Sequence, residues 1–351
     1  MKTLAAILVK TGHPLELTEI QIPELKQGQV LVEIAYSGAC GTQVMEVKGL
    51  KGKDGWLPHC LGHEGSGTVL DVSSSVTKVK KGDKVILSWL KGAGIEAGGT
   101  IYQWEGRQVN AGAVTTFQKY AVVSENRLTV LPKEVQMDVA VLLGCAAPTG
   151  MGAVYNVLKM QAGDCIAIFG LGGIGLNACL AAALGGASKI ICIEPSPTRR
   201  EMAKLFGATH VIDPENSDTI DEIKHIASHG VDLAVEATGL PQVMSLVMQS
   251  TRAQGGRAVV IGNAKHGSVL SLDPTQLNQG KSLMGTWGGD SMPDRDYPRY
   301  GRLLMSHRYP VKDMLSKPYS LESINQALDD LASGKVGRPL IDMSLSGRDS
   351  R

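Results

Sequence analysis

The pattern of hydrophobic and polar positions differs between two stretches of the chain. In the first third, short apolar runs alternate with turns rich in Gly, Ser, Lys and Asp. The runs cover residues 30–36, 67–72, 84–89 and 116–123. Short runs of this kind, bounded by turn residues, are typical of β-strands. This stretch therefore predicts an irregular β domain.

The hydrophobic pattern changes at about Ala146, where apolar runs begin to alternate with helical stretches. The strand candidates are residues 165–169, 189–193, 210–212, 231–236 and 257–261. Strands that alternate with helices predict a parallel sheet wrapped by helices. After about Trp287 the pattern loosens into Pro- and Asp-containing turns, followed by an expected helix over 321–333 that ends at Gly334.

Length and charge narrow the class of protein. A chain of 351 residues exceeds the size at which one hydrophobic core stops growing, so two domains are expected. Hydrophobic residues make up 43% and charged residues 20%, which are ordinary values for a soluble globular protein. The formal net charge of +1, with no long block of Lys and Arg, argues against a nucleic-acid partner. We expect a small-molecule partner instead.

No segment predicts export or a membrane anchor. The apolar stretch within residues 1–10 is too short for the core of a signal peptide. The longest run of small and apolar residues, 176–186, falls well short of the roughly 20 needed to cross a bilayer. The six Cys lack the dense, regular spacing of a disulfide-stapled secreted domain. We therefore expect a cytoplasmic protein without membrane contact.

A glycine-rich turn follows the first strand candidate of the second stretch. Its glycines are Gly170, Gly172, Gly173 and Gly175, with Ile174 between the last two, and an Ala-rich helical run comes next. This G-x-G-x-x-G pattern between strand and helix lets the backbone approach a pyrophosphate, which then meets the positive end of the helix. A glycine-rich turn between a strand and a helix often has only a structural role. Its context here predicts a dinucleotide site.

An acidic residue stands at the end of the following strand candidate. Glu194 lies where a carboxylate can accept hydrogen bonds from the ribose hydroxyls of the coenzyme. The alternative is an ordinary carboxylate at a strand end. Arg199 and Arg200 are close enough in sequence to contact the coenzyme or to bind a 2′-phosphate, but the Glu194 charge would repel that phosphate. We expect NAD rather than NADP.

Three potential metal ligands occur in glycine-flanked segments: Cys40, His63 and Cys145. Two thiolates and one imidazole suit Zn²⁺ and leave a fourth tetrahedral position open for catalysis. Their spacing alone does not demand a metal, because a free Cys is most often a small buried hydrophobe. That interpretation is preferred for the other four cysteines, Cys60, Cys165, Cys179 and Cys192.

Together these segments resemble the zinc-containing alcohol dehydrogenases of the medium-chain dehydrogenase/reductase superfamily. The similarity spans nearly the whole chain. In order, the shared segments are Cys-Gly-Thr at 40–42, Gly-His-Glu-Gly at 62–65, Gly-Asp-Lys-Val at 82–85, Thr-Phe-Gln-Lys-Tyr at 116–120, Leu-Gly-Cys at 143–145 with Thr-Gly at 149–150, and the glycine-rich turn. A series of this length in this order is highly specific.

The resemblance implies roles for residues of the metal segments. Cys40, His63 and Cys145 match the catalytic zinc ligands, and Glu64 matches a carboxylate that can approach the metal. Thr42 matches the hydroxyl that contacts the substrate oxygen and starts a proton relay. The implied reaction binds an alcohol oxygen to zinc, passes its proton to Thr42 and transfers a hydride to NAD⁺.

The resemblance also implies contacts elsewhere. Thr149 matches a residue that contacts nicotinamide, Ile174 an aliphatic side chain behind the ring, and Arg338 a late arginine at the pyrophosphate. Trp89 matches a residue of the substrate pocket. Without the resemblance, Trp89 would equally suit a core aromatic and Arg338 a solvated tail residue.

The fold implied by the resemblance is a two-domain α/β architecture. A GroES-like β catalytic domain would comprise residues 1–146 and 288–351, so that the C-terminal tail joins the first domain. A Rossmann coenzyme domain with a doubly wound parallel sheet would comprise residues 147–287. Members of the family are usually dimers or tetramers, so a homodimer or homotetramer is expected.

Three departures from the family pattern stand out. Many relatives bind a second, structural zinc through four closely spaced Cys, whereas residues 90–112 contain none, so one zinc per chain is predicted. Gln43 replaces an Asp that usually supports the metal site, which changes the charge beside the metal. Met45 occupies the place of a His that often ends the proton relay, so the relay must finish elsewhere.

The substrate is less well defined by the sequence. We favour a secondary alcohol or a polyol, because residues 92–110 are rich in Gly and contain Tyr102, Trp104, Glu105 and Arg107 as candidate contacts. The alternatives are a short aliphatic alcohol, or a threonine-type or glutathione-adduct dehydrogenase. A non-catalytic dinucleotide-binding relative is disfavoured by the intact ligand set. A zinc-free, NADPH-dependent quinone or enoyl reductase is disfavoured by the same ligands and by Glu194.

Overall fold

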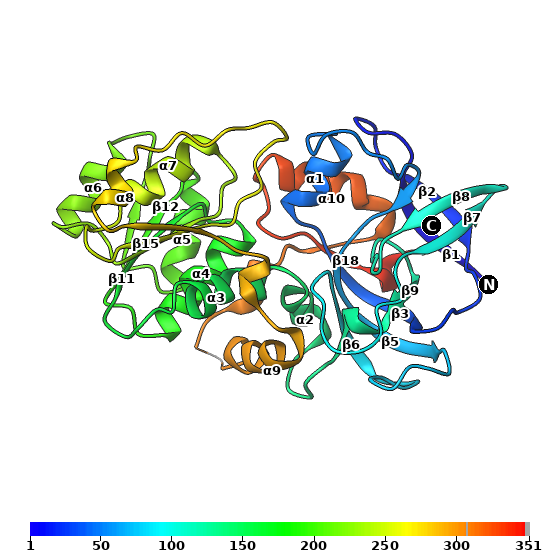
Figure 1. The fold of residues 1–351 in the computed structure, drawn as a ribbon. Coiled ribbons are helices and arrows are strands. Elements are labelled where there is room, and N and C mark those ends of the chain that lie inside the picture. The colour runs from blue at the N-terminus through cyan, green and yellow to red at the C-terminus, as the bar shows by residue number, and fades with distance from the viewer. Residues whose placement is uncertain (307, 348–351) are drawn as a thin grey trace. The chain divides into compact units, whose positions relative to one another are not determined.

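The computed structural model describes residues 1–306 and 308–347. It divides into two compact units (Figure 1). Unit 1 comprises Met1–Cys145, Met292–Met305 and the chain from Val311 onward, and unit 2 comprises Ala146–Ser291 and Ser306–Pro310. The C-terminal tail thus belongs with the N-terminal β region. The predicted two-domain α/β fold class is confirmed.

Unit 1 is built mainly from short strands. Its strands are β1 (Lys2–Leu8), β2 (Glu16–Gln21), β3 (Gln29–Gly38), β4 (His59–Cys60), β5 (Glu64–Val72), β6 (Lys84–Ser88), β7 (Thr100–Trp104), β8 (Arg107–Ala111), β9 (Tyr120–Ser124), β10 (Leu128–Val130), β17 (Pro318–Tyr319) and β18 (Leu340–Asp342). Its α-helices are α1 (Gly41–Val47), α2 (Met137–Leu143), α9 (Pro293–Leu304) and α10 (Ile324–Ala332).

The strands of unit 1 form a barrel and a sheet. The closed barrel runs β1-β2-β7-β8-β4, and the sheet runs β10-β6-β5-β3-β18-β17 with β9 also paired to β3. Strand β9 is shorter than the predicted run over 116–123, because the backbone N–H groups of Thr116 and Phe117 donate to the Leu61 carbonyl before the chain joins β3. The expected helix over 321–333 begins as a 3₁₀ turn and becomes α10 at Ile324.

Residues 90–112, which contain no cysteine, include the β7–β8 hairpin, visible in Figure 1. Tyr102 and Trp104 of this hairpin point into the barrel and are buried with Ile20 and Val109. The Tyr102 hydroxyl accepts hydrogen bonds from the Gln118 side chain and the Val122 backbone. Both side chains therefore contribute mainly to the barrel core, and a substrate contact by residues 92–110 stays a prediction.

Unit 2 alternates strands and helices. Its strands are β11 (Cys165–Phe169), β12 (Lys189–Ile193), β13 (His210–Ile212), β14 (Leu233–Glu236), β15 (Arg257–Val260) and β16 (Ser282–Gly285). Its α-helices are α3 (Ala146–Gly152), α4 (Gly173–Leu184), α5 (Pro197–Leu205), α6 (Thr219–Ile226), α7 (Pro241–Gln249) and α8 (Thr275–Asn278).

The unit 2 sheet is parallel, with strand order β13-β12-β11-β14-β15-β16. The first strand, β11, lies in the middle, and the order reverses between β11 and β14. In doubly wound sheets, ligands bind at the carboxyl ends of the strands beside such a reversal. The topology therefore places a binding site at the turn that follows β11.

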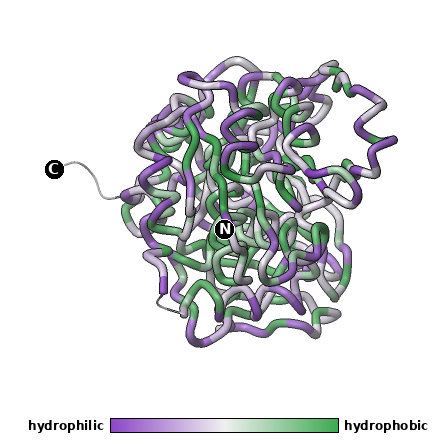
Figure 2. Tube along the Cα trace, turned by 90° about the vertical axis from the view of Figure 1, so that its left-hand side faces the viewer, coloured by the Kyte–Doolittle hydropathy of each residue, from purple (hydrophilic) through white to green (hydrophobic). Residues whose placement is uncertain are grey.

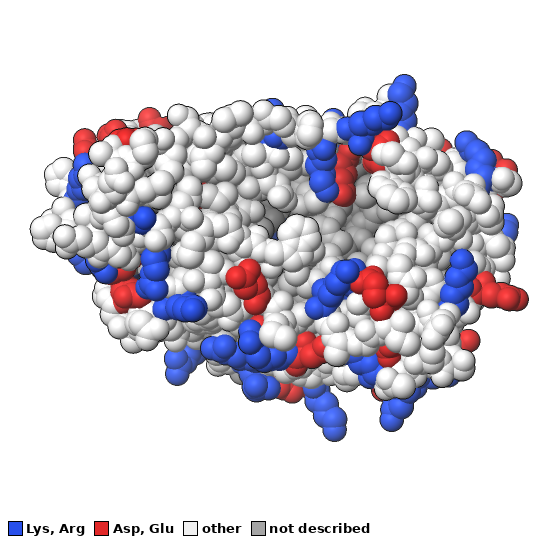
Figure 3. Space-filling view, in the orientation of Figure 1, with Lys and Arg blue, Asp and Glu red and all other residues white. Residues whose placement is uncertain are grey.

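Hydropathy along the trace follows this architecture. Figure 2 shows hydrophobic stretches toward the inside and hydrophilic stretches at the periphery. Lys, Arg, Asp and Glu side chains are interspersed on the face shown in Figure 3. Among the described residues, no single helix combines the length and apolar character needed to cross a bilayer, and only the adjoining segments Met137–Leu143 and Ala146–Val157 reach that threshold when taken together.

Candidate metal centre and dinucleotide site

Three ligands converge in unit 1 from separate elements. Cys40 caps the N-terminus of α1, His63 directly precedes β5, and Cys145 follows α2. One ligand atom from each residue lies within 4.8 Å of the other two. The Cys40 Sγ and His63 Nε2 atoms are 3.3 Å apart. Zn–S bonds of about 2.3 Å and Zn–N bonds of about 2.0 Å require separations close to these, so the donor set fits a tetrahedral zinc ion.

Interactions within the cluster stabilise the negatively charged thiolate form of Cys40. A hydrogen bond from Cys145 and the nearby His63 imidazole hold the pKa of the Cys40 thiol well below its usual range. The same hydrogen bond, together with burial, raises the pKa of the Cys145 thiol. Burial opposes charge on His63, yet the Cys40 charge outweighs it and raises the His63 pKa. Because the thiolate is the metal-ligating form, Cys40 is prepared to bind a cation.

Glycines allow the chain to close around Glu64. A Cβ atom on Gly38 would lie 2.5 Å from the Glu64 Oε1 atom. A Cβ atom on Gly144 would lie 2.7 Å from the Glu64 Cβ atom and 2.6 Å from the Leu87 carbonyl oxygen. These approaches explain why glycine precedes Cys145 and lies two residues before Cys40.

Glu64 itself is fully buried and paired with a buried arginine. Its Oε2 atom lies 3.2 Å from Arg338 Nη2, and Arg338 Nη1 donates to the Ala39 carbonyl at 3.4 Å. Burial raises the Glu64 pKa to about 7, although the Arg338 charge opposes this shift. Removing one partner of such a buried pair typically costs about 3–5 kcal/mol. Arg338 is thus placed behind the metal ligands, and its contact with a pyrophosphate stays a prediction.

Other predicted residues surround the ligands. Thr42 lies on the first turn of α1, two residues after Cys40, and is half-buried. The Trp89 ring packs edge-on against the His63 imidazole, with ring centroids 6.4 Å apart. Gln43 is buried beneath the same imidazole, where its amide lies 2.5 Å from His63 Nδ1. Gln43 therefore directly contacts one of the predicted metal ligands.

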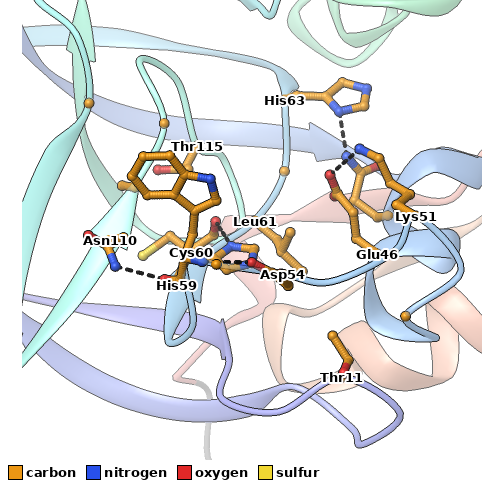
Figure 4. Close-up of a pocket in the computed structure, with 18 of the residues that line it drawn as sticks. Thr11, Glu46, Lys51, Asp54, His59, Cys60, Leu61, His63, Asn110 and Thr115 are labelled. Carbon is orange, nitrogen blue, oxygen red and sulfur yellow. Dashed lines mark hydrogen bonds and ion pairs between the residues drawn. The ribbon is translucent and has the colours of Figure 1, made fainter. Parts of the chain in front are cut away.

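A cavity of about 570 Å³ opens beside His63 and Gln43, and all of its lining residues belong to unit 1. Figure 4 shows Glu46 near Lys51, and Asp54 against His59. The Lys51 ammonium donates to Glu46 at 2.8 Å, and His59 Nε2 lies 2.9 Å from an Asp54 oxygen.

The charged part of this lining, Glu46, Lys51, Lys53 and Asp54, was not predicted from the sequence. Its one local signal is the concentration of charged residues between α1 and β4. Asn110 at the end of the β7–β8 hairpin also lines the cavity, and its amide donates to the Trp56 carbonyl. Trp89 does not belong to the lining, so its role toward substrate stays a prediction.

The glycine-rich turn of unit 2 has the geometry of a phosphate cradle. Gly170 adopts a φ of +88°, which favours glycine. A Cβ atom on Gly175 would lie 1.8 Å from the Gly170 carbonyl oxygen, so only glycine fits there. A Cβ atom on Gly172, the N-cap of α4, would meet no protein atom within 4 Å. The open space at Gly172, at the positive end of α4, fits a pyrophosphate.

Glu194 lies beside this turn, as predicted from the end of its strand. The residue is only 4% exposed, and its Oε2 atom accepts the Leu171 backbone N–H at 2.8 Å. Arg199 Nη1 lies 3.9 Å from the other Glu194 oxygen. Arg200 is paired with Asp213 at 2.9 Å. The acid is therefore held against the turn, and both arginines lie within ion-pair distance of a carboxylate.

Helix α3 packs directly on the start of α4. A Cβ atom on Gly150 would lie 2.3 Å from the Ile174 carbonyl oxygen, so the two helices are in backbone contact. Thr149 is buried one residue before this contact. The structure thus brings Thr149 and Ile174 close to the same turn, while Gly173 begins α4 and accepts from the Asn177 amide.

Known proteins resemble this chain along almost its whole length. Residues 26–133 match the alcohol dehydrogenase GroES-like domain, and residues 173–306 match the zinc-binding dehydrogenase family. An S-(hydroxymethyl)glutathione dehydrogenase of Synechocystis sp. is 33% identical, over 97% of this chain and 100% of that protein.

Solved structures also match this chain over almost its whole length. An alcohol dehydrogenase zinc-binding domain protein from Burkholderia ambifaria superimposes with a TM-score of 0.90 at 31% identity, covering 97% of this chain and 99% of the other. Benzyl alcohol dehydrogenase from Acinetobacter calcoaceticus gives a TM-score of 0.89 at 30% identity with the same coverage. This chain is accordingly an oxidoreductase with zinc and a nicotinamide dinucleotide as cofactors, and it belongs to the zinc-containing alcohol dehydrogenase family of the medium-chain dehydrogenase/reductase superfamily.

Proposed function

We propose that the chain oxidises a secondary or polyhydroxylated alcohol, with NAD⁺ as the coenzyme. The observation that carries this proposal is the cavity beside His63, whose lining presents carboxylates, amides, imidazoles and ammonium groups. Groups of these kinds bind several hydroxyls at once, because each hydroxyl both donates and accepts.

The residues around the proposed zinc ion have separate roles in the reaction. A zinc ion held by Cys40, His63 and Cys145 would act as a Lewis acid that makes an alcohol easier to deprotonate. We propose that Thr42, on the adjoining turn of α1, relays the alcohol proton, accepting it at its hydroxyl while passing its own proton onward. The buried Glu64 balances the charge of Arg338 directly behind the ligands. Met45 carries no ionisable group, so the proton leaves by a route other than the side chain at this position.

The choice of coenzyme depends on Glu194. A bound dinucleotide would supply the hydride acceptor, and the Glu194 carboxylate would accept from its ribose hydroxyls while repelling a 2′-phosphate. We expect Glu194→Gln to weaken NAD⁺ binding roughly tenfold and to narrow the preference over NADP⁺, because the amide carries no charge. Titration of both coenzymes by fluorescence measures this change. A wild-type preference for NADP⁺ would contradict the assignment.

A second substrate class is favoured by the relatives. Several curated relatives at 32–33% identity are named S-(hydroxymethyl)glutathione dehydrogenase. The exposed Lys53 at the cavity, beside the paired Lys51, offers a partner for a substrate carboxylate. A glutathione adduct is therefore the alternative substrate.

A substrate panel separates the two classes. NADH formation would be followed with polyols, secondary alcohols, benzyl alcohol, short primary alcohols, threonine and S-hydroxymethylglutathione. We expect the highest kcat/KM with a polyol or secondary alcohol. Preferred turnover of the glutathione adduct, reduced in Lys53→Gln, would establish the alternative and overturn the first proposal.

We propose a homodimer or homotetramer formed through unit 2. In this unit β16 forms one edge of the sheet, and the apolar side chains of Val269 and Trp287 are exposed. We further propose a reducing compartment, the cytoplasm, since none of the six cysteines forms a disulfide, even Cys179 and Cys192 with sulfur atoms 3.8 Å apart.

A further inference from the structure

Gln43 links two groups of the metal site through the two ends of its side-chain amide. Its Oε1 atom accepts the Cys40 backbone N–H at 2.9 Å. Its Nε2 atom lies 2.5 Å from His63 Nδ1. The other ring nitrogen, His63 Nε2, faces the Cys40 sulfur at 3.3 Å. Gln43 is only 1% exposed, so these contacts are largely shielded from solvent.

This network is complete for one tautomer of His63. When the Gln43 amide nitrogen donates to Nδ1, that ring nitrogen must be unprotonated. The ring proton then resides on Nε2, where it points at the Cys40 sulfur. In this arrangement the Cys40 N–H, both ends of the Gln43 amide and both ring nitrogens of His63 each have a partner.

Zinc requires the opposite tautomer. The nitrogen that faces the thiols is Nε2, and it binds a metal only through its lone pair, so the proton must move to Nδ1. Nδ1–H and the Cys40 N–H are then two donors that both need an acceptor from Gln43. An amide offers one acceptor group and one donor group.

Neither orientation of the amide resolves this conflict. With the oxygen on the Cys40 N–H, the amide N–H₂ faces Nδ1–H. With the amide turned over, its oxygen accepts from Nδ1–H, but its N–H₂ faces the Cys40 N–H. A carboxylate at this position would accept from both donors. The buried donor that loses its partner carries a desolvation penalty that zinc binding must overcome.

We propose that Gln43 is a positioning residue that holds His63 in the tautomer adverse to zinc, so that this site binds zinc more weakly and more reversibly than a carboxylate at position 43 would allow. The inference rests on zinc ligation by Cys40, His63 and Cys145 and is independent of the substrate. Its measure is the zinc affinity itself, not turnover.

The first test compares zinc affinity in wild type and Gln43→Glu by competition with a chromophoric chelator. We expect the variant to bind zinc roughly 10–100-fold more tightly, the range over which partners of metal-bound histidines act. Gln108→Glu is the matched control, since it makes the same chemical change at an exposed position of unit 1 and should leave zinc affinity unchanged. Equal affinities in wild type and Gln43→Glu would overturn the proposal.

The second test reads the tautomer directly and separates it from the added charge. Long-range ¹H–¹⁵N spectra of histidine-labelled, zinc-free protein distinguish Nδ1–H from Nε2–H, and His63→Asn assigns the signal. We expect the Nε2–H form in wild type and the Nδ1–H form in Gln43→Glu. If zinc-free wild type already carries Nδ1–H, the tautomer proposal fails even when Gln43→Glu binds zinc more tightly, because charge alone then explains the gain.

Discussion

Cys40→Ser should remove zinc from the protein and lower kcat/KM by at least roughly a thousandfold, equivalent to about 4 kcal/mol of transition-state stabilisation. The Cys40 thiol has a lowered pKa and lies against both other ligands. A serine hydroxyl stays protonated at neutral pH and is a poor zinc ligand. Elemental analysis should find about one zinc per chain in wild type and none in the variant.

The matched control is Cys165→Ser, the same substitution at a half-buried cysteine of unit 2. This variant should retain both zinc and turnover. A wild type that folds and binds coenzyme without zinc would contradict the metal assignment, and two zinc ions per chain would contradict the expectation of a single catalytic ion.

Two substitutions in the glycine-rich turn should have different effects. Gly175→Ala places a methyl group 1.8 Å from the Gly170 carbonyl oxygen, a clash with backbone that no side-chain movement relieves. We expect it to lower the free energy of unfolding of unit 2 by about 3 kcal/mol and to abolish coenzyme binding. Gly172→Ala meets no protein atom within 4 Å, so the fold should keep its stability.

Gly172→Ala should nevertheless weaken NAD⁺ binding at least roughly tenfold, because its methyl group occupies the space left for the pyrophosphate. Thermal melts and coenzyme titrations of both variants measure the two effects separately. Normal coenzyme affinity in a stable Gly172→Ala protein would show that the pyrophosphate does not approach this glycine.

Much of the fold could be predicted because its signals are local. Strands β6, β11 and β12 agree with the predicted runs to within a residue, since a short apolar run bounded by turn residues has little freedom to be anything else. The same holds for the turn at Gly170–Gly175. Strand β9 was predicted too long, because a contact with the distant Leu61 decides where its pairing begins.

The sequence by itself determined the kinds of chemistry present: the glycine-rich turn with its acid Glu194, and, through the order of its motifs, a zinc ligand set. Only the tertiary structure decided how close these functional side chains lie to one another. Cys40, His63 and Cys145 meet because β3, β5 and α2 pack together, and Arg338 reaches Glu64 from the far end of the chain. Turn chemistry and side-chain periodicity act over a few residues, whereas such contacts depend on how whole elements pack. For the same reason, only the structure shows which end of the Gln43 amide faces His63.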